Sequence, residues 1–196
     1  GMSSWLELDE AVATLQSNGC QDLTLLQCTS EYPCPPEQSG LNVLGEMQAR
    51  YRDIKVGYSD HTLGVAVPLA AVVMGASVIE KHFTLSRKMY GSDAMNSTEP
   101  DEFKRLVQEV RQVELALKSH VDKDKKVKSL FDMKVTFEKS IVSNCRISKS
   151  EVITENHLAF KKPGDGLPAR QFRNIIGKKI NKDVQKDHVF ELSDFE

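Results

Sequence analysis

Residues 54–85 read IKVGYSDHTLGVAVPLAAVVMGASVIEKHFTL, and this stretch decides the fold. Its two ends, 54–58 and 76–80, are short segments with branched apolar residues, which are typical of buried strands. Residues 64–74 between them are mostly small or branched, and we interpret them as a helix. A strand, a helix and a second strand in this order predict two parallel strands joined by a right-handed crossover.

The alternation continues on both sides of this stretch. Before it, a capping box begins an amphipathic helix over residues 4–17, a nearly all-apolar strand covers 23–27, and a helix covers 40–51. After it, residues 99–117 keep the 3.6-residue period of a long helix. Strands that recur once per strand–helix unit fit either a (β/α) barrel or an open doubly wound sheet. We therefore predict an α/β fold with about three parallel strands.

The composition changes after residue 118. Residues 119–133 are polar and charged without a clean period, and we interpret them as a linker. Residues 134–196 are predicted to form a small β-rich domain. It is indicated by branched runs at 140–142, 151–153 and 189–190, a Pro-Gly turn at 163–168 and a short helix at 171–176. The predicted domains are therefore 1–118 and 134–196.

Composition and charge narrow the class of protein. The 196 residues include 26 basic and 28 acidic side chains, for a net charge of −2. This near-neutral balance disfavours nucleic acid or an anionic membrane as the main partner. No uninterrupted apolar stretch approaches the roughly 20 residues that a bilayer requires. The four cysteines form no CxxC pair and no secretion signal precedes them, so we expect free thiols in the cytoplasm.

Polar side chains follow each predicted strand, in residues 27–32, 57–62 and 80–84. In parallel sheets, ligands bind where the carboxyl ends of the strands meet. His61 and His82 lie one strand–helix unit apart, so they should project from adjacent strand ends about 5 Å apart. This spacing would let both imidazoles reach one metal ion.

The same residues have structural interpretations, which the spacing leaves open. A histidine after a strand is more often a hydrogen-bonded structural residue than a metal ligand. Tyr32 precedes a proline and is common in turns, and Ser59 with its neighbour Asp60 would also cap the next helix. Cys28 could serve as a small buried apolar residue. A role as a nucleophile is disfavoured because the sequence places no base for it.

Several motifs together resemble the sialic acid synthases (N-acetylneuraminate synthases). They are residues 25–33, 57–64, 79–85, 91–93 and 97–100. Residues 140–142, 162–166 and 176–179 resemble the antifreeze-like (SAF, β-clip) domain that follows the barrel in that family. The resemblance covers nearly the whole chain and preserves the order of the motifs. It implies the C-terminal part of a (β/α)8 TIM-type barrel followed by a β-clip domain.

The resemblance also implies an activity. Members of the family are transferases that condense phosphoenolpyruvate with N-acetylmannosamine or a related amino sugar, with a divalent metal. Manganese is the usual ion, with magnesium or cobalt possible, and an ion held there would supply Lewis-acid chemistry to the sugar aldehyde. The implied site residues are the metal ligands His61 and His82, the catalytic residues Asp93 and Tyr32, and the substrate-binding residues Ser30, Tyr32, Ser59 and Lys162.

Three positions depart from the family pattern. Lys162 stands where the family has an arginine that touches the N-acetyl group of the sugar, and lysine lacks the planar guanidinium fork. Many members have histidine at the positions of Gln27 and Ala94.

In the family the β-clip domain reaches into the barrel of a neighbouring subunit, so the resemblance implies a domain-swapped homodimer.

The chain begins at a segment that resembles the loop after the fifth barrel strand. The implied remainder carries phosphate-binding lysines and an acid/base glutamate, so we expect this chain to need an N-terminal barrel half for activity. It is either a piece of a longer protein or a short reading frame that starts at Met2, and the match of Gly1 and Met2 to the family favours the first. The alternative function is a non-catalytic truncated module whose SAF domain serves dimerisation or carbohydrate contact.

Overall fold

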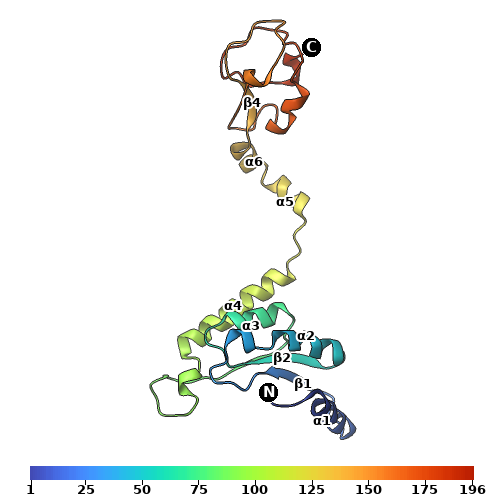
Figure 1. Cartoon of the computed structure of the whole chain (residues 1–196), viewed down its shortest axis with the longest axis vertical. Coiled ribbons are helices and arrows are strands. Elements are labelled where there is room, and N and C mark those ends of the chain that lie inside the picture. Colours follow the sequence, from blue (N-terminus) through green and yellow to red (C-terminus); the bar gives the residue numbers. More distant parts are fainter. The chain divides into compact units, whose positions relative to one another are not determined.

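The computed structural model describes residues 1–196, which fold as two compact units, unit 1 (Gly1–His120) and unit 2 (Val121–Glu196). Unit 1 alternates helices with strands in the predicted order (Figure 1). Its elements are α1 (Trp5–Ser17), β1 (Thr24–Cys28), α2 (Leu41–Arg50), β2 (Lys55–Asp60), α3 (Ala66–Val73), β3 (Ile79–Lys81) and α4 (Pro100–Lys118), with short 3-10 helices at Pro36–Gln38 and Ala94–Asn96.

The three strands form one parallel sheet in the order β1-β2-β3, which confirms the expected α/β arrangement. The register pairs Tyr58 with Ile79, and it pairs Ser59 with both Cys28 and Glu80. Because successive side chains alternate, these two rows point to opposite faces of the sheet. The row through Tyr58 joins the core that α2 and α3 cover, whose buried members are Val12, Leu44, Met47, Tyr51, Val56, Tyr58 and Ala71. The row through Ser59 lies on the other face.

Helix α1 begins where the sequence predicts. The Ser4 hydroxyl accepts a hydrogen bond from the Glu7 N–H, and the Glu7 carboxylate accepts one from the Ser4 N–H at 2.7 Å. The Ser4 N–H and the Ser4 hydroxyl, which both donate to this carboxylate, hold the pKa of Glu7 below its usual value. An ion pair between Asp9 and Arg50 attaches α1 to the end of α2, and the Tyr51 hydroxyl donates to Asp9 at 2.8 Å. Together Arg50 and Tyr51 lower the pKa of Asp9 to about 2.

Helix α4 is the longest in the chain, with 19 residues. It packs against α3 and buries Leu106, whereas Leu115 and Leu117 near its end remain exposed. No helix in the structure combines the length and the apolar composition that a membrane crossing requires.

Unit 2 is built around a small apolar core with only two paired strands, β4 (Ser140–Ser143) and β5 (Leu158–Lys161), which run antiparallel. The runs 151–153 and 189–190 were expected as strands, but each forms only an isolated bridge, Val152 with Lys179 and Val142 with Val189. The helix expected at 171–176 is a 3-10 helix at Ala169–Asn174, and further 3-10 turns lie at Glu155–His157 and Leu192–Asp194. The buried core residues are Ile141, Ile147, Ile153, Leu158, Leu167, Ile175, Ile180, Val184 and Phe190.

The segment 119–133, which we interpreted as a linker, is largely helical. It contains α5 (Lys123–Ser129) and the start of α6 (Phe131–Phe137). The Asp122 carboxylate caps α5 by accepting hydrogen bonds from the N–H groups of Asp124 and Lys125, at 3.0 and 3.1 Å. Capping of a short helix is a local signal that charge composition alone does not reveal.

Candidate metal and substrate site

Three aromatic rings gather where β2 and β3 end. His61 directly follows β2, His82 directly follows β3, and their ring centroids lie 5.0 Å apart. The ring of Tyr32, from the loop after β1, lies 4.2 Å from that of His61 and 5.6 Å from that of His82. The expected proximity of the two imidazoles is therefore confirmed, and Tyr32 packs against both.

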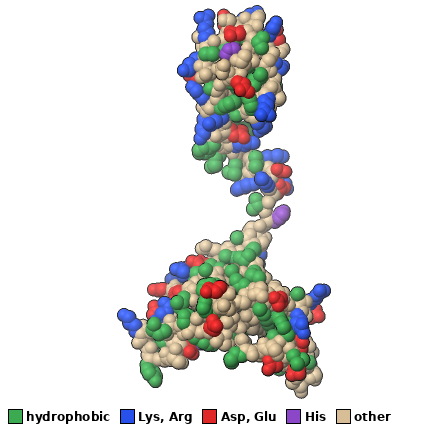
Figure 2. All heavy atoms as spheres, viewed as in Figure 1, with side chains coloured by type: hydrophobic (Ala, Val, Ile, Leu, Met, Phe, Trp, Pro, Cys, Tyr) green, Lys and Arg blue, Asp and Glu red, His purple; other side chains and the backbone are tan.

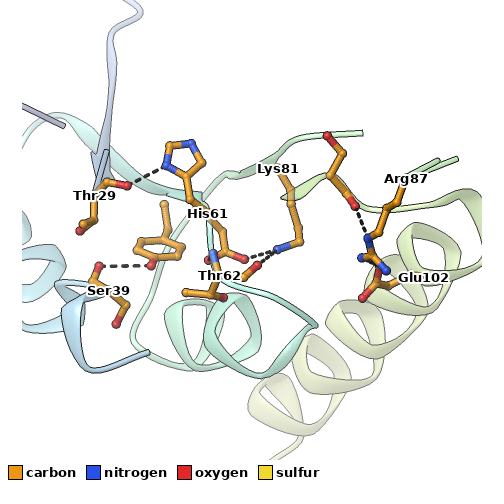
Figure 3. Close-up of polar contacts among 10 residues, drawn as sticks. Thr29, Ser39, His61, Thr62, Lys81, Arg87 and Glu102 are labelled. Atoms are coloured by element: carbon orange, nitrogen blue, oxygen red, sulfur yellow. Dashed lines mark hydrogen bonds and ion pairs between the residues drawn. The ribbon is translucent and has the colours of Figure 1, made fainter. Parts of the chain in front are cut away.

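His61 is held in one orientation by the loop after β1. Its Nδ1 lies 2.7 Å from the carbonyl oxygen of Thr29 (Figure 3). Because a carbonyl oxygen only accepts hydrogen bonds, Nδ1 carries the proton, and Nε2 of the neutral ring keeps a free lone pair. The residue is buried, and the Cys28 sulfur lies 3.9 Å from the same Nδ1. His61 therefore offers Nε2 as its available ligand atom.

Asp93 lies beside His82. Its Oδ2 is 3.8 Å from Nδ1 of His82, and both side chains are partly exposed. The distance is too long for a direct hydrogen bond and is compatible with a bridging water. A carboxylate on this side of the ring favours the proton on Nδ1, so that His82 also keeps Nε2 for a ligand.

The loop that carries Asp93 is anchored by Arg87, which we did not single out from the sequence. The Arg87 guanidinium forms an ion pair with Glu102 of α4 and donates to the Ser97 carbonyl at 2.8 Å (Figure 3). The Arg87 N–H donates to the Glu99 carboxylate, also at 2.8 Å. Both ends of the loop are thus tied to the start of α4. The signal available in the sequence was the pair of acidic residues Glu99 and Glu102 at the start of the predicted helix, which could bind a nearby arginine.

The two serines predicted to bind substrate are placed differently. The Ser59 hydroxyl donates to Glu80 at 2.7 Å, and alternation along β2 and β3 puts this pair on the same face as His61 and His82. Ser30 lies against Gly1 and makes no side-chain hydrogen bond. We did not single out Glu80 from the sequence. It lies two residues before His82, so its side chain is expected to point to the same face of the sheet.

A buried ion pair between Asp60 and Lys81 was also missed. Its two members immediately precede His61 and His82 in the sequence, and this repeated placement of a charged residue before each histidine was the available signal. The pair lies on the helix-covered face of the sheet, because Asp60 and Lys81 continue the row through Tyr58 and Ile79.

Lys162 is the one predicted site residue that lies in unit 2. It directly follows β5, and its ammonium lies 4.8 Å from the ring centroid of Phe137. The structure therefore brings Tyr32, His61, His82 and Asp93 together and places Lys162 in a separate unit.

The donor set fits a metal ion only in part. The two imidazoles can each offer Nε2, but no three or more His, Cys, Asp or Glu side chains are arranged to hold an ion by themselves. Such a set suits a divalent ion that keeps several positions for water or substrate oxygens. Imidazole nitrogen favours a transition-metal ion over magnesium.

Comparisons with known proteins place these features in a family context. Residues 1–122 match the model of the NeuB family. An uncharacterised protein of Methanocaldococcus jannaschii is 40% identical over 99% of this chain and 57% of its own length. The N,N'-diacetyllegionaminic acid synthase of Campylobacter jejuni is 37% identical over 96% of this chain and 56% of its own length. The chain thus spans about half the length of the curated relatives it matches.

A solved structure supports the same relationship. The N-acetylneuraminic acid (sialic acid) synthetase of Leptospira borgpetersenii superposes with a TM-score of 0.58 at 29% identity. The match covers 70% of this chain and 48% of that protein.

Proposed function

The chain belongs to the NeuB family, and from this membership we propose that it provides the metal-binding part of a sialic acid-type synthase. The proposed reaction condenses phosphoenolpyruvate with an N-acetylated amino sugar. The observation that carries the proposal is the pair of imidazoles at the ends of adjacent parallel strands, 5.0 Å apart, with the Nδ1 proton of His61 committed to Thr29. Parallel α/β folds place catalytic groups at this end of the sheet.

Each residue of the site has a proposed role. His61 and His82 hold a divalent ion, Mn²⁺ with Mg²⁺ or Co²⁺ as alternatives, and such an ion would supply Lewis-acid chemistry to the sugar aldehyde. Asp93 orients His82 and is the acidic group beside the sugar. Tyr32 packs against both imidazoles, tilted over the His61 ring and edge-on to the His82 ring.

Phosphoenolpyruvate is proposed to bind through Ser30 and Ser59. In the structure the Ser59 hydroxyl proton points to Glu80. Binding of an anionic phosphate therefore requires this proton to turn from the Glu80 carboxylate to the ligand, because an anion needs a donor. Glu80 would then act as the partner that holds the serine rotamer in the free protein.

The acceptor is proposed only as a class, an N-acetylated amino sugar. The Campylobacter jejuni relative is named for legionaminic acid, and the Leptospira protein is named for sialic acid. Both kinds of product share the N-acetyl group that the resemblance assigns to the position of Lys162.

Unit 2 is proposed to be an antifreeze-like (SAF) domain that contacts unit 1 of a second copy, bringing Lys162 to the sugar. The charges of the two units support this pairing. Unit 1 has 10 basic and 16 acidic side chains, whereas unit 2 has 16 basic and 12 acidic ones. Figure 2 shows Lys and Arg side chains spread over the visible surface of unit 2. Opposite net charges favour and orient such an association.

The metal assignment is tested by unfolding the chain with and without Mn²⁺. Trp5, the only tryptophan, lies in unit 1 and reports its unfolding by fluorescence. At a Mn²⁺ concentration of about 100 times Kd, we expect about 2.7 kcal/mol of added stability. H61A/H82A should lose this gain, whereas the control H120A/H157A should keep it. A wild-type chain that Mn²⁺ does not stabilise would contradict the assignment.

The condensation is tested by supplying the remaining barrel half. The chain is co-expressed with the part of the Campylobacter jejuni relative that lies outside the match, and consumption of phosphoenolpyruvate is followed with N-acetylmannosamine and other N-acetylated amino sugars. We expect sugar-dependent consumption that D93N abolishes. A folded, oligomeric complex that consumes no phosphoenolpyruvate would favour the non-catalytic module instead.

A further inference from the structure

A buried ion pair joins the ends of β2 and β3 next to the two imidazoles. Asp60 is the last residue of β2, Lys81 is the last residue of β3, and the two are register partners. Lys81 Nζ lies 2.5 Å from Asp60 Oδ2, and the two side chains are 3% and 0% exposed. Burial of a charge pair has a large desolvation cost, so stability alone is a weak explanation for it.

The ion pair and the imidazoles occupy opposite faces of the same strand ends. Asp60 is followed by His61, and Lys81 is followed by His82, so alternation sends the charged pair one way and the two rings the other. In Figure 3 the Lys81 ammonium reaches toward the helices, whereas the His61 ring lies on the opposite side of the backbone. The Asp60–Lys81 ion pair therefore lies directly behind the two histidines, on the other face of the sheet.

The same network also holds the residue after His61. The Thr62 N–H donates to Asp60 Oδ1 at 3.0 Å, and Lys81 Nζ donates to the Thr62 carbonyl at 2.6 Å (Figure 3). Both oxygens of the Asp60 carboxylate are therefore used. The two neighbours of His61 are thus both bonded to the Lys81 ammonium, Asp60 through its carboxylate and Thr62 through its backbone carbonyl.

We propose that Asp60 and Lys81 are positioning residues that set the separation of His61 and His82. The pair fixes the two strand ends against each other and thereby sets the position between the two rings. The role of that position as a metal site rests on the proposed function, whereas the spacing of the rings does not. Asp60 and Lys81 point to the face of the sheet opposite the two imidazoles.

The chain offers a matched control at the other end of the sheet. Lys55, the first residue of β2, pairs with Asp22 at 3.2 Å, and these side chains are 64% and 88% exposed. This pair ties β2 to the segment before β1, far along the strand from the histidines. K55M removes the same kind of charge without disturbing the strand ends that carry the imidazoles.

The test variant is D60N/K81M, which removes both charges together. It leaves no unpaired charge in the interior, and the asparagine oxygen can still accept from the Thr62 N–H. D60E, which keeps both charges but lengthens the link, is the second variant in case the double variant does not fold. Both are compared with K55M in the full chain.

Two measurements decide the proposal. The first is the set of ¹H–¹⁵N signals of the imidazole rings without metal, with His120, His157 and His188 as internal references. The second is Mn²⁺ affinity, which we expect to weaken about 10- to 100-fold, as is usual when the support of a metal ligand is removed. Ring signals of His61 and His82 should shift in D60N/K81M and in D60E, and not in K55M.

Unchanged ring signals in a folded D60N/K81M or D60E variant would overturn the positioning role, and so would an unchanged affinity in a wild type that binds Mn²⁺. If the wild type binds no Mn²⁺, the proposed metal function fails, and the ring signals alone then decide whether the ion pair sets the spacing. Failure of the two proposals is therefore distinguishable.

Discussion

Asp194 shows how a single buried carboxylate is stabilised in unit 2. It accepts hydrogen bonds from His188 Nε2 at 2.8 Å and from the Glu191 N–H at 3.0 Å, and it forms an ion pair with Lys182. Burial alone would raise the pKa of Asp194, but the bonds from Lys182, Glu191 and His188 outweigh it and lower the pKa below its usual value. Unit 2 is therefore more stable when this carboxylate is ionised.

The sign of the pH dependence follows from the lowered pKa. The contribution is fully present above the unfolded-state pKa of about 3.9 and is lost as the pH falls through the lower pKa of the folded state. D194N should therefore reduce the stability of unit 2 at pH 7 by about 1.5–3 kcal/mol, with the difference from wild type shrinking in acid. Urea unfolding followed by the NMR methyl signals of Ile141 and Ile147 measures it.

Asp187 provides the control for this prediction. Lys161 lowers its pKa through a hydrogen bond of 2.6 Å, but the pair is about half exposed. Its φ of 70° suits asparagine as well as aspartate, so D187N introduces no backbone strain. Solvent screens an exposed pair of this kind and leaves it little effect on stability, so D187N should have the smaller effect. Equal losses in D187N and D194N would show that burial of Asp194 is unimportant.

At the scale of the strands, Gly57 permits the close contact between the three members of the sheet. A Cβ added there would lie 2.6 Å from the Val78 carbonyl oxygen and 2.5 Å from Leu26 Cδ2. The first contact is with backbone, which cannot move aside as a flexible side chain would. Gly57 lies two residues before Ser59, so displacement of β2 at this point would also move the strand that carries His61.

A pair of glycine substitutions tests this close contact. G57A should lower the free energy of unfolding of unit 1 by about 1–3 kcal/mol through overpacking. Gly45, within α2, has no atom within 4 Å of an added Cβ, so G45A should raise that free energy by about 0.5–1 kcal/mol. Urea unfolding followed by Trp5 fluorescence reports both. Equal effects of the same sign would contradict the proposed crowding at Gly57.

For the molecule as a whole, the main feature is the opposite charge of its two units. The net charge of the chain is only −2 because an acidic unit 1 and a basic unit 2 nearly cancel. A formal charge near zero would otherwise suggest weak electrostatic interactions. When the charges of the two units are counted separately, they instead predict an attraction between unit 2 of one copy and unit 1 of another.

Salt should weaken this association. Raising the salt from about 0.1 M to about 1 M shortens the Debye length from about 10 Å to about 3 Å. We therefore expect sedimentation velocity to show a larger dimer fraction at the lower salt concentration. A dimer fraction that does not change with salt would indicate that apolar contacts, rather than the charges of the two units, hold the copies together.

The sequence determined the architecture of unit 1 and the neighbouring placement of His61 and His82. Both follow from short-range patterns, because strand and helix periods show within each segment and one strand–helix unit separates the two histidines. The same local reasoning was less successful in unit 2. There the runs 151–153 and 189–190 have strand composition but find only isolated bridges, because pairing depends on partners distant in the chain.

The tertiary structure alone decided which side chains support the site. The Asp60–Lys81 pair, the Ser59–Glu80 hydrogen bond and the bond from His61 to Thr29 all join residues at least 21 positions apart. A shift of one residue in the pairing of β2 with β3 would send each side chain to the opposite face. The residue types are therefore written in the sequence, but their partners are set by the register of the sheet.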